Sequence, residues 1–342
     1  MKVTIRDIAE AANVSRGTVD RALHDRPGVN QEVAEKIKKL AKEMGYKPDI
    51  AARVLASKKY SKTIGVILSS KGNPFFKDVK NGIRQALEGM SHFGIQSIIR
   101  EIKGYDEQKQ LAEIEKLRKM DISGLIITPA NSELVAQKLK DLEDNNIPVV
   151  TINTDIDSVK HLAYVGCDYV ASGRVAAELI GMMSNGKEKH IAVAVGSNLA
   201  RAHLERVQGL RETLSQDYKN VVIDTIIENG EDNEISYLTI KELLKKDAQI
   251  SGICFVGAGL EGGLKAIKEV LPERKLQIVT YDLTDSVREN LETGVISVTV
   301  CQEPFQQGYQ GVMILGEYLL YGTKPENAVI HTHVFVATKY NL

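Results

Sequence analysis

Short apolar runs rich in β-branched residues alternate with segments of helical spacing from residue 63 onward, and this alternation limits the fold more than any other feature. The runs that predict strands are TIGVILSS, IQSIIRE, GLIITPA, IPVVTIN, HLAYVGCD, HIAVAVG, VVIDTIIE, GICFVG, QIVTYD, VISVTVCQ and HTHVFVAT. Helical patterns lie between most of them, and residues 170–183 and 204–214 are clear examples. Strands that alternate with helices form parallel sheets with helices on both faces. Eleven strands exceed one comfortable sheet, so we predict an α/β core of two doubly wound parallel-sheet subdomains.

The N-terminal segment shows only helical patterns. A capping-box sequence, Thr4-Ile5-Arg6-Asp7, predicts the start of a first helix, and Asn13 suits the left-handed conformation that ends it. Ser15 is placed to cap a second helix, and a third follows Asn30 and ends at Gly45. These patterns predict an all-α module of three short helices.

The second helix of this module has one apolar and one polar face. Val19, Ala22 and Leu23 share the apolar face. The opposite face carries Arg16, Gly17, Asp20, Arg21 and His24. Two short helices with arginines near the start of the second are typical of a helix-turn-helix, and the arginine fork can donate two hydrogen bonds to guanine.

Charge is distributed unevenly along the chain. The first 62 residues hold 14 Lys and Arg against 8 Asp and Glu, whereas the whole chain has 44 against 45. The remainder is therefore acidic. A basic head on an acidic body favours a polyanion as the partner of the head, although a solvated lysine-rich surface would have the same charge.

A short segment, residues 49–56, follows the three helices and is too short to be a stable helix alone. Residues 57–62 read as a basic linker. The segment could become ordered on DNA, with Leu55 inserted into a minor-groove base step, or Leu55 could pack against the next domain. Both interpretations remain open.

Several classes of protein are excluded. No apolar stretch approaches the ~18 residues of a membrane helix, and the first ten residues lack the apolar core of a secretory signal. Cys167, Cys254 and Cys301 are too few and too scattered for a disulfide framework or a thiolate metal site. We therefore expect a cytoplasmic protein with no membrane partner.

Polar residues follow the ends of several predicted strands, where open α/β sheets bind ligands. The candidate ligand contacts at these ends are Asn73, Phe75, Phe76, Asn153, Asp155, Arg201, His203, Asp282 and Gln302. Amides and carboxylates can share paired hydrogen bonds with adjacent hydroxyls, while an aromatic ring packs on an apolar sugar face. Each polar residue alone could also be a helix cap or a turn, but their joint placement indicates a site for a sugar or related polyol.

These motifs together carry a resemblance. Residues 4–62 resemble the headpiece of LacI-family transcriptional regulators, and 63–342 are similar to that family's core, which resembles type I periplasmic sugar-binding proteins. The most specific stretches are TIRDIAEAANVSRGTVDRAL, ARVLA, NPFFKDVKNGI, TYDLT and CQEPFQQGYQG. The implied organisation is a headpiece at 1–48, a hinge at 49–62 and a core at 63–342. Within the core the expected N-subdomain is about 63–160 plus about 303–328, and the expected C-subdomain is about 161–302 plus about 329–342.

The resemblance also implies roles. It implies a homodimer, or a higher oligomer, that represses from a pseudo-palindromic operator under the control of a sugar, polyol or sugar phosphate. Arg16, Gly17 and Arg21 match base-reading positions, and the hinge residues Arg53 and Leu55 match DNA contacts. The positions that match phosphate contacts are Thr4, Ser15, Thr18 and Asn30. In the core, the positions that match sugar contacts are Asn73, Phe75, Phe76, Asn153, Asp282 and Gln302.

The chain departs from the family pattern at several of these places. Asp20, His24 and Asp49 replace the usual Ser, Asn and Asn, so the operator need not be a common one. Asp20 could accept from a cytosine amino group or orient Arg16. In the core, residues 257–262 replace a common Asn-Asp, and Leu204 replaces a common arginine, for which Arg201 or His203 could substitute.

A rival interpretation comes from Gly257-x-Gly259-x-x-Gly262, which follows a strand and precedes a helix, with Asp282 about 25 residues on. This spacing resembles a dinucleotide fingerprint and would suit a nicotinamide-dependent redox sensor or oxidoreductase. The motif lies late in the chain without a proton-relay set beside it. We therefore expect no cofactor and no enzymatic activity. His331 and His333 share a strand face but have no third ligand, so we also expect no metal.

Overall fold

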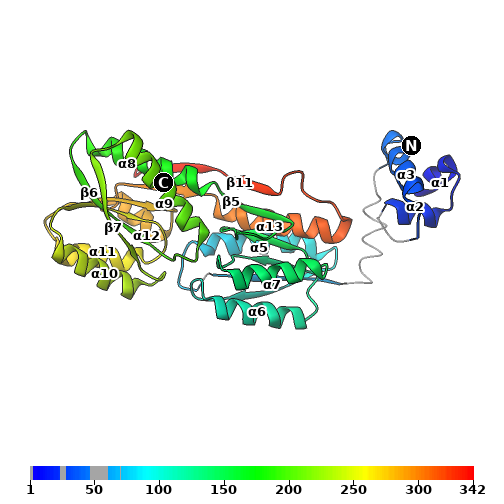
Figure 1. The fold of residues 1–342 in the computed structure, drawn as a ribbon, viewed down its shortest axis with the longest axis horizontal. Helices are drawn as coiled ribbons and strands as arrows, with labels where there is room; N and C mark the ends of the chain where they lie inside the picture. The colour runs from blue at the N-terminus through cyan, green and yellow to red at the C-terminus, as the bar shows by residue number, and fades with distance from the viewer. Residues whose placement is uncertain (1–2, 24–27, 47–60, 70) are drawn as a thin grey trace. The chain divides into compact units, whose positions relative to one another are not determined.

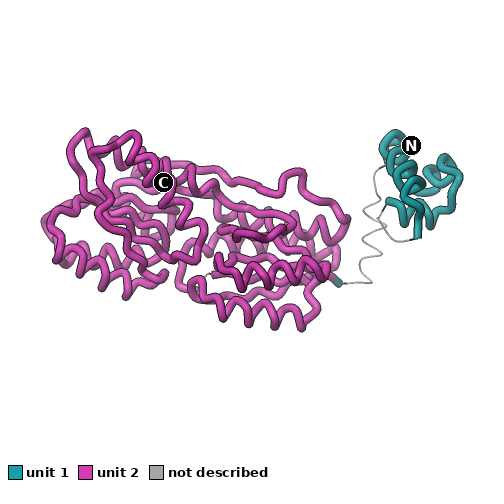
Figure 2. Tube along the Cα trace, viewed as in Figure 1, with its two compact units in different colours: residues 1–61 teal, residues 62–342 magenta. Residues whose placement is uncertain are grey.

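The computed structural model describes residues 3–23, 28–46, 61–69 and 71–342. The chain divides into two compact units, residues 1–61 and 62–342, which we call the headpiece and the core (Figure 2). His24, Asp49, Arg53 and Leu55 lie outside the described residues, as does most of the predicted hinge.

The headpiece contains the three predicted helices, α1 (Ile5–Ala12), α2 (Arg16–Leu23) and α3 (Gln31–Glu43) (Figure 1). The side chain of Thr4 accepts a hydrogen bond from the backbone of Asp7, and the Asp7 carboxylate accepts one from the backbone of Thr4, which is the predicted capping box. Asn13 is left-handed, with a φ of 55°. The apolar faces meet in a small core of Ile8, Ala9, Ala12, Val19, Ala22, Ile37 and Ala41.

The first sheet of the core is entirely parallel, in the order β11-β5-β4-β3-β1-β2. Its strands are β1 (Lys62–Leu68), β2 (Ile95–Glu101), β3 (Gly124–Ile127), β4 (Val149–Ile152), β5 (Ala163–Cys167) and β11 (Val329–Thr332). One face packs on α5 (Phe76–Ser91) and α13 (Pro304–Tyr321), and the other on α6 (Glu107–Lys119) and α7 (Glu133–Asp144). This layer is the first subdomain.

The second sheet has the order β12-β10-β9-β8-β6-β7, and only the pairing of β12 with β10 is antiparallel. Its strands are β6 (Lys189–Val195), β7 (Val221–Glu228), β8 (Ile250–Phe255), β9 (Gln277–Tyr281), β10 (Val298–Gln302) and β12 (Val334–Ala337). Helices α8 (Tyr169–Ser184) and α9 (Arg201–Asp217) cover one face. The other face is covered by α10 (Asn233–Lys246), α11 (Leu260–Val270) and α12 (Asp285–Glu292). Helices on both faces of two sheets confirm the predicted fold class.

The first subdomain extends a few residues beyond the approximate boundaries predicted at 160 and 328. β5 and β11 pair with each other in the first sheet, so the chain crosses between the subdomains after Cys167 and again at His333. The predicted strand HTHVFVAT is in fact the end of β11 and all of β12, which belong to different sheets. Apolar alternation marks a strand but does not say which sheet it joins, because both sheets bury both faces.

Among the described residues, no helix combines the length and the apolar character that crossing a membrane requires.

Candidate functional site

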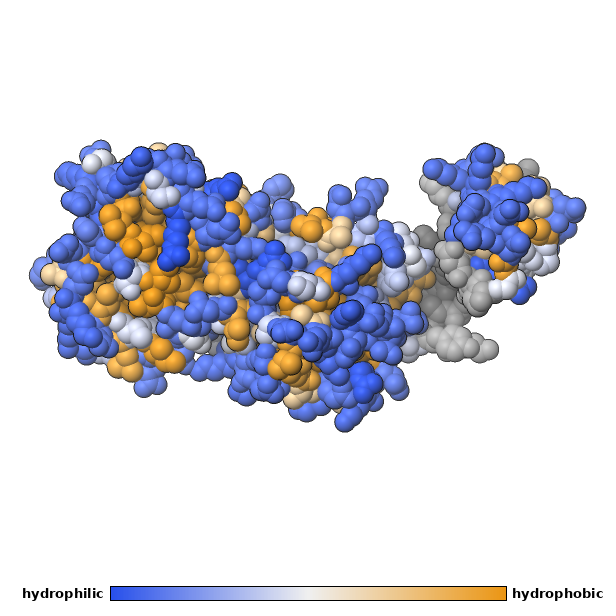
Figure 3. Space-filling model, viewed as in Figure 1, coloured by the Kyte–Doolittle hydropathy of each residue, from blue (hydrophilic) through white to orange (hydrophobic). Residues whose placement is uncertain are grey.

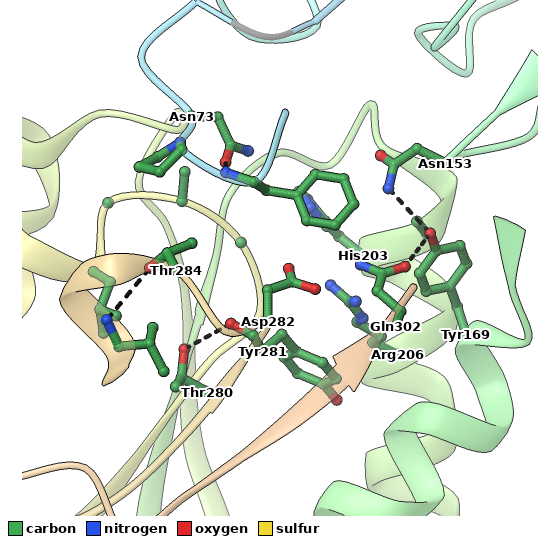
Figure 4. Close-up of a pocket in the computed structure, with 18 of the residues that line it drawn as sticks. Asn73, Asn153, Tyr169, His203, Arg206, Thr280, Tyr281, Asp282, Thr284 and Gln302 are labelled. Carbon is green, nitrogen blue, oxygen red and sulfur yellow. Dashed lines mark hydrogen bonds between the residues drawn. The ribbon is translucent and has the colours of Figure 1, made fainter. Parts of the chain in front are cut away.

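A cleft lies between the carboxyl ends of the two sheets, with an empty volume of about 630 Å³ that includes its open mouth. The first subdomain contributes Asn73 and Phe75 from the loop after β1, and Asn153 from the end of β4. The second subdomain contributes side chains from the N-terminal ends of α8 and α9, the loop after β8, and the ends of β9 and β10. In Figure 4 the labelled side chains converge from both subdomains on one space.

Six of the nine predicted ligand contacts line this cleft. They are Asn73, Phe75, Asn153, His203, Asp282 and Gln302. They come from both subdomains, and Asn73 and Gln302 lie at nearly opposite ends of the core sequence. The rule that ligands bind beyond strand ends therefore located most of the cleft.

Phe76, Asp155 and Arg201 do not line the cleft. Phe76 is 1% exposed and packs in the apolar core between the first sheet, α5 and α13. The loop after β1 aims Phe75 into the cleft, and the T-shaped contact between the two rings leaves Phe76 facing inward.

Asp155 and Arg201 belong to an ion-pair network beside the cleft. Arg201 lies 3.1 Å from Asp157 and 2.8 Å from Glu205, with Asp155 at 3.8 Å. Asp155 also accepts from Thr151 and lies 3.2 Å from His161. The carboxylates hold the Arg201 side chain in this network, so it does not replace the arginine expected on α9.

Arg206, four residues beyond Ala202 on α9, is the cationic residue of the cleft that the sequence reading missed. Leu204 does not line the cleft and is 42% exposed, whereas Arg206 lines the cleft and is 4% exposed. The arginine expected on α9 is therefore present in the cleft, two residues beyond Leu204. The Arg206 guanidinium lies 3.8 Å from the centre of the Tyr281 ring and 4.9 Å from that of Tyr169. A sequence signal was present, since Arg206 falls on the apolar stripe formed by Ala202, Val207 and Leu210.

Two buried charges in the cleft have unpartnered atoms among the described residues. Nε and Nη2 of Arg206 and Oδ1 of Asp282 are buried with no hydrogen-bond partner there. Figure 4 shows these two side chains pointing toward one another. Buried polar atoms are normally satisfied, so these donors and this acceptor indicate a place for a polar ligand.

A chain of hydrogen bonds orients the amides on one wall. Asn153 donates to the Tyr169 hydroxyl (3.1 Å), which donates to Oε1 of Gln302 (2.8 Å), and Gln307 donates to the same oxygen (3.0 Å). Asn153 and Asp282 both have left-handed backbones, with φ of 64° and 67°. Such strain in non-glycine residues is concentrated at functional sites.

Burial governs the ionisation of the cleft. It raises the pKa of Asp282 to about 6, against the opposing effects of the Arg206 charge and the Gln302 hydrogen bond. Burial and the Arg206 charge lower the pKa of His203 to about 3, so this imidazole is neutral. Its Nδ1 lies 3.1 Å from the backbone nitrogen and 3.2 Å from the carbonyl oxygen of Ser197. Glu231, behind the cleft, has its pKa raised by burial.

Packing explains the glycines of the loop before α11 and of the first turn of that helix. A Cβ at Gly262 would lie 1.7 Å from the carbonyl of Asn233, and one at Gly263 would lie 2.4 Å from Phe255. The Glu231 carboxylate lies 2.7 Å from the Cβ position of Gly257, so a pyrophosphate there would meet a negative charge. The loop does not fit a dinucleotide.

The two histidines near the C-terminus are also structural. The His331 ring packs edge-on against Tyr164, and the backbone of His333 donates to Glu303. No group of three or more His, Cys, Asp or Glu side chains is placed to hold a metal within the described part of the chain.

On the headpiece, the predicted base-reading residues Arg16, Gly17 and Arg21 are exposed on α2, and Arg21 Nε donates to the Gly17 carbonyl (3.0 Å). The predicted phosphate contacts lie at helix N-termini, which favour anions. Thr4 and Asn30 cap α1 and α3, and Ser15 accepts from the backbone of Thr18 at the start of α2. Asp20 and Thr18 are partly buried.

Comparison with known proteins gives the same division. Residues 4–49 match the model of bacterial regulatory proteins of the lacI family, and residues 64–324 match the periplasmic binding protein domain. Catabolite control protein A of Priestia megaterium is 27% identical over 328 residues, which cover 93% of both chains. The probable HTH-type transcriptional repressor ExuR of Bacillus subtilis is 28% identical over 246 residues, covering 71% of this chain and 69% of that one.

Solved structures share the fold of the core. GanP, a glucose-galactose binding protein from Geobacillus stearothermophilus, superposes with a TM-score of 0.75 at 24% identity, covering 82% of this chain and 99% of its own. A solute-binding protein from Burkholderia graminis, in complex with D-arabinose, has a TM-score of 0.74 at 24% identity, covering 82% and 96%. At this identity the likeness concerns the fold. Because residues 4–49 match the lacI model, residues 64–324 match the periplasmic binding protein domain and the relatives are regulators, the chain belongs to the lacI family of bacterial regulatory proteins, as a DNA-binding transcriptional regulator and not an enzyme.

Proposed function

We propose that the protein represses transcription from an operator bound by α2, and that an uncharged sugar or polyol in the cleft controls this binding. The observation that carries the proposal is a pair of buried groups, Arg206 and Asp282, each of which has side-chain atoms without a hydrogen-bond partner among the described residues. A ligand hydroxyl can accept from the guanidinium and donate to the carboxylate, so adjacent hydroxyls would satisfy both.

The charge of the cleft favours an uncharged ligand. Arg206 is opposed by Asp282 within the cleft and by Glu231 behind it, and His203 is neutral. A phosphate or carboxylate on the ligand would add a negative charge to a site where Arg206 is already opposed by the acids Asp282 and Glu231. We therefore favour a neutral sugar over the sugar phosphates that the sequence alone left open. The solved structures named for glucose, galactose and arabinose supply the first compounds to test.

Coupling to DNA would run through closure of the cleft. The two subdomains are joined by three chain crossings, and a ligand held from both sides favours the closed arrangement. Closure would change the spacing of two headpieces in a dimer. Whether the ligand releases DNA or strengthens its binding is decided by the experiment below.

We further propose that the protein is a homodimer, since a two-fold operator requires two headpieces. The edge strand β7 supports this proposal, because apolar side chains gather over the region of β6 and β7 in Figure 3. Val222 on this strand is 40% exposed, and Ile235 and Leu238 on α10 are 46% and 57% exposed. Light scattering after size exclusion should give twice the monomer mass, and a monomer at micromolar concentration would contradict the dimer.

The function is tested on the full-length protein in two steps. D-arabinose, D-galactose, D-glucose and a polyol panel are titrated in a thermal-shift assay, and at least one should raise the melting temperature. Selected genomic fragments are then bound with and without that compound at moderate ionic strength. No preference for any fragment over competitor DNA, with or without a metabolite extract, would overturn the proposal.

A further inference from the structure

We propose that Glu231, a residue outside the cleft lining, is a positioning residue. From the second subdomain it orients the Asn73 amide of the first subdomain, and this bond holds the cleft closed. The inference rests on the proposed role of the cleft, but concerns a side chain that no strand-end or motif argument singled out. Glu231 lies in the loop between β7 and α10 in the second subdomain, and it is 6% exposed.

The backbone holds Glu231 in an unusual conformation. Its φ is 60°, a left-handed value that is uncommon for a glutamate. The Glu231 N–H lies 3.1 Å both from the carbonyl of Gly196 and from Oδ1 of Asn229, which hold this turn. A long acidic side chain is therefore directed inward at a position where a glycine would be less strained.

Two neighbouring glycines leave room for the Glu231 carboxylate. A Cβ on Gly196 would lie 1.8 Å from Oε1 of Glu231, and one on Gly257 would lie 2.7 Å from the same oxygen. Two strand-end glycines thus leave the volume that the carboxylate fills. Any side chain at Gly196 would displace it.

The carboxylate contacts three residues of the cleft wall. Oε2 accepts from Nδ2 of Asn73 at 2.9 Å, and Oε1 accepts from the backbone of Ala258 at 3.3 Å. Nε2 of His203 lies 3.6 Å from Oε1. Asn73, Ala258 and His203 all line the cleft, whereas Glu231 does not, so Glu231 acts through them.

The bond to Asn73 joins the two subdomains. Asn73 Oδ1 also accepts from the backbone of Phe75 (3.1 Å), so both ends of the amide are fixed and its orientation is defined. Two ion pairs at the rim also cross the cleft. The side chains of Lys77 and Asp285 are 68% and 92% exposed, and those of Lys103 and Asp232 are 57% and 22% exposed, whereas Glu231 is 6% exposed. Exposed pairs are screened by water and salt, so the buried Asn73–Glu231 bond is the better candidate for a closing contact.

The first test measures closure without any ligand. Spin labels are placed on Lys140→Cys in α7 and Lys268→Cys in α11, which are exposed and belong to opposite subdomains. The natural cysteines are buried and should not react. Double electron–electron resonance should give one short distance between the two labels in the parent protein and a longer, broader distance distribution in Glu231→Ala. Glu228→Ala is the matched control, because Glu228 bonds only within the second subdomain, to Asn198, in the contacts described here.

A charge swap separates positioning from a folding defect. Asn73→Asp sets two carboxylates against each other and should open the cleft. Adding Glu231→Gln restores the bond with its polarity reversed, so the double variant should return toward the parent distance. A double variant as open as Asn73→Asp, or an unchanged distance in Glu231→Ala, would overturn the proposal.

Sugar binding gives the second readout. D-arabinose, D-galactose and D-glucose are titrated calorimetrically. Glu231→Ala should lower the affinity for any sugar that binds the parent protein at least tenfold, whereas Glu228→Ala should change that affinity less than twofold. Equal affinity of Glu231→Ala and the parent would count against positioning. If none of the three binds the parent, the sugar assignment fails, while the distance measurement still decides the role of Glu231.

Discussion

The headpiece and the cleft differ in how far apart in the chain their functional residues lie. In the described helices of the headpiece, the proposed DNA contacts fall between Thr4 and Asn30, and each helix start is fixed by a side chain bonded two or three residues away. In the cleft, the Asn73–Glu231 bond joins residues 158 positions apart. A surface made by one helix and its caps can be read locally, whereas a cleft made by two sheets depends on which strand ends the topology brings together.

The largest expected effect is a loss of sugar affinity, which should follow substitution of a cleft residue but not of a charged residue beside the cleft. Asp282→Ala should remove the Oδ1 acceptor and weaken sugar binding more than 100-fold, about 2.7 kcal/mol or more, because a ligand hydroxyl loses a charged partner. Arg201→Ala should change it less than threefold, since Arg201 belongs to the ion-pair network beside the cleft. Calorimetric titration with the sugar found by thermal shift measures both, and DNA binding without sugar should be intact in each. Equal losses would erase the distinction between the two residues.

The headpiece should respond independently of the cleft. Arg21→Ala should weaken binding to the selected operator by about 1–3 kcal/mol, because a base-reading arginine loses its paired hydrogen bonds. Fluorescence anisotropy on operator and on random DNA gives the comparison, and the sugar affinity should not change. A loss of the same size on random DNA would contradict base reading.

Two glycines of α5 have the same type of sequence position but different packing, so the same substitution should change the unfolding free energy in opposite directions. A Cβ at Gly82 in α5 would lie 2.0 Å from the carbonyl of Phe305 in α13, so Gly82→Ala should cost about 1–3 kcal/mol of unfolding free energy. Gly89 in the same helix has nothing within 4 Å of its Cβ position, so Gly89→Ala should stabilise by about 0.5–1 kcal/mol. Urea unfolding followed by circular dichroism compares them. Equal midpoints would mean that α5 and α13 are less close than described.

The smallest effect is a pH dependence in the first subdomain. Burial alone would lower the pKa of His161, but the hydrogen bond and charge of Asp155 outweigh it and raise this pKa above 6.5. The resulting stabilisation, ~1 kcal/mol or less, is therefore fully present below pH 6.5 and is lost as pH rises through the raised pKa. His161→Gln should flatten the change in unfolding free energy between about pH 6 and 9. A variant with the parent's slope would place the pH dependence elsewhere.

The sequence reached much of the fold because its evidence was local. Capping at Thr4, the left-handed Asn13 and the apolar alternation of the strands all depend on neighbours a few residues apart. Polar residues at strand ends located Asn73, Asn153, Asp282 and Gln302, since parallel strands place their carboxyl ends at one edge. These features hold whatever the rest of the chain does.

Tertiary structure decided the remainder. The sequences of β5 and β11 look like those of the other strands, and only their pairing assigns them to the first sheet. Arg206 became a cleft residue because α9 directs its buried face at the strand ends, and Phe76 was excluded because the helix start turns it inward. Glu231 gained its role from a partner in the opposite subdomain and from two glycines that leave it room. The physical reason is common to all of these, because burial and hydrogen-bond partners are set by chain segments that are distant in sequence.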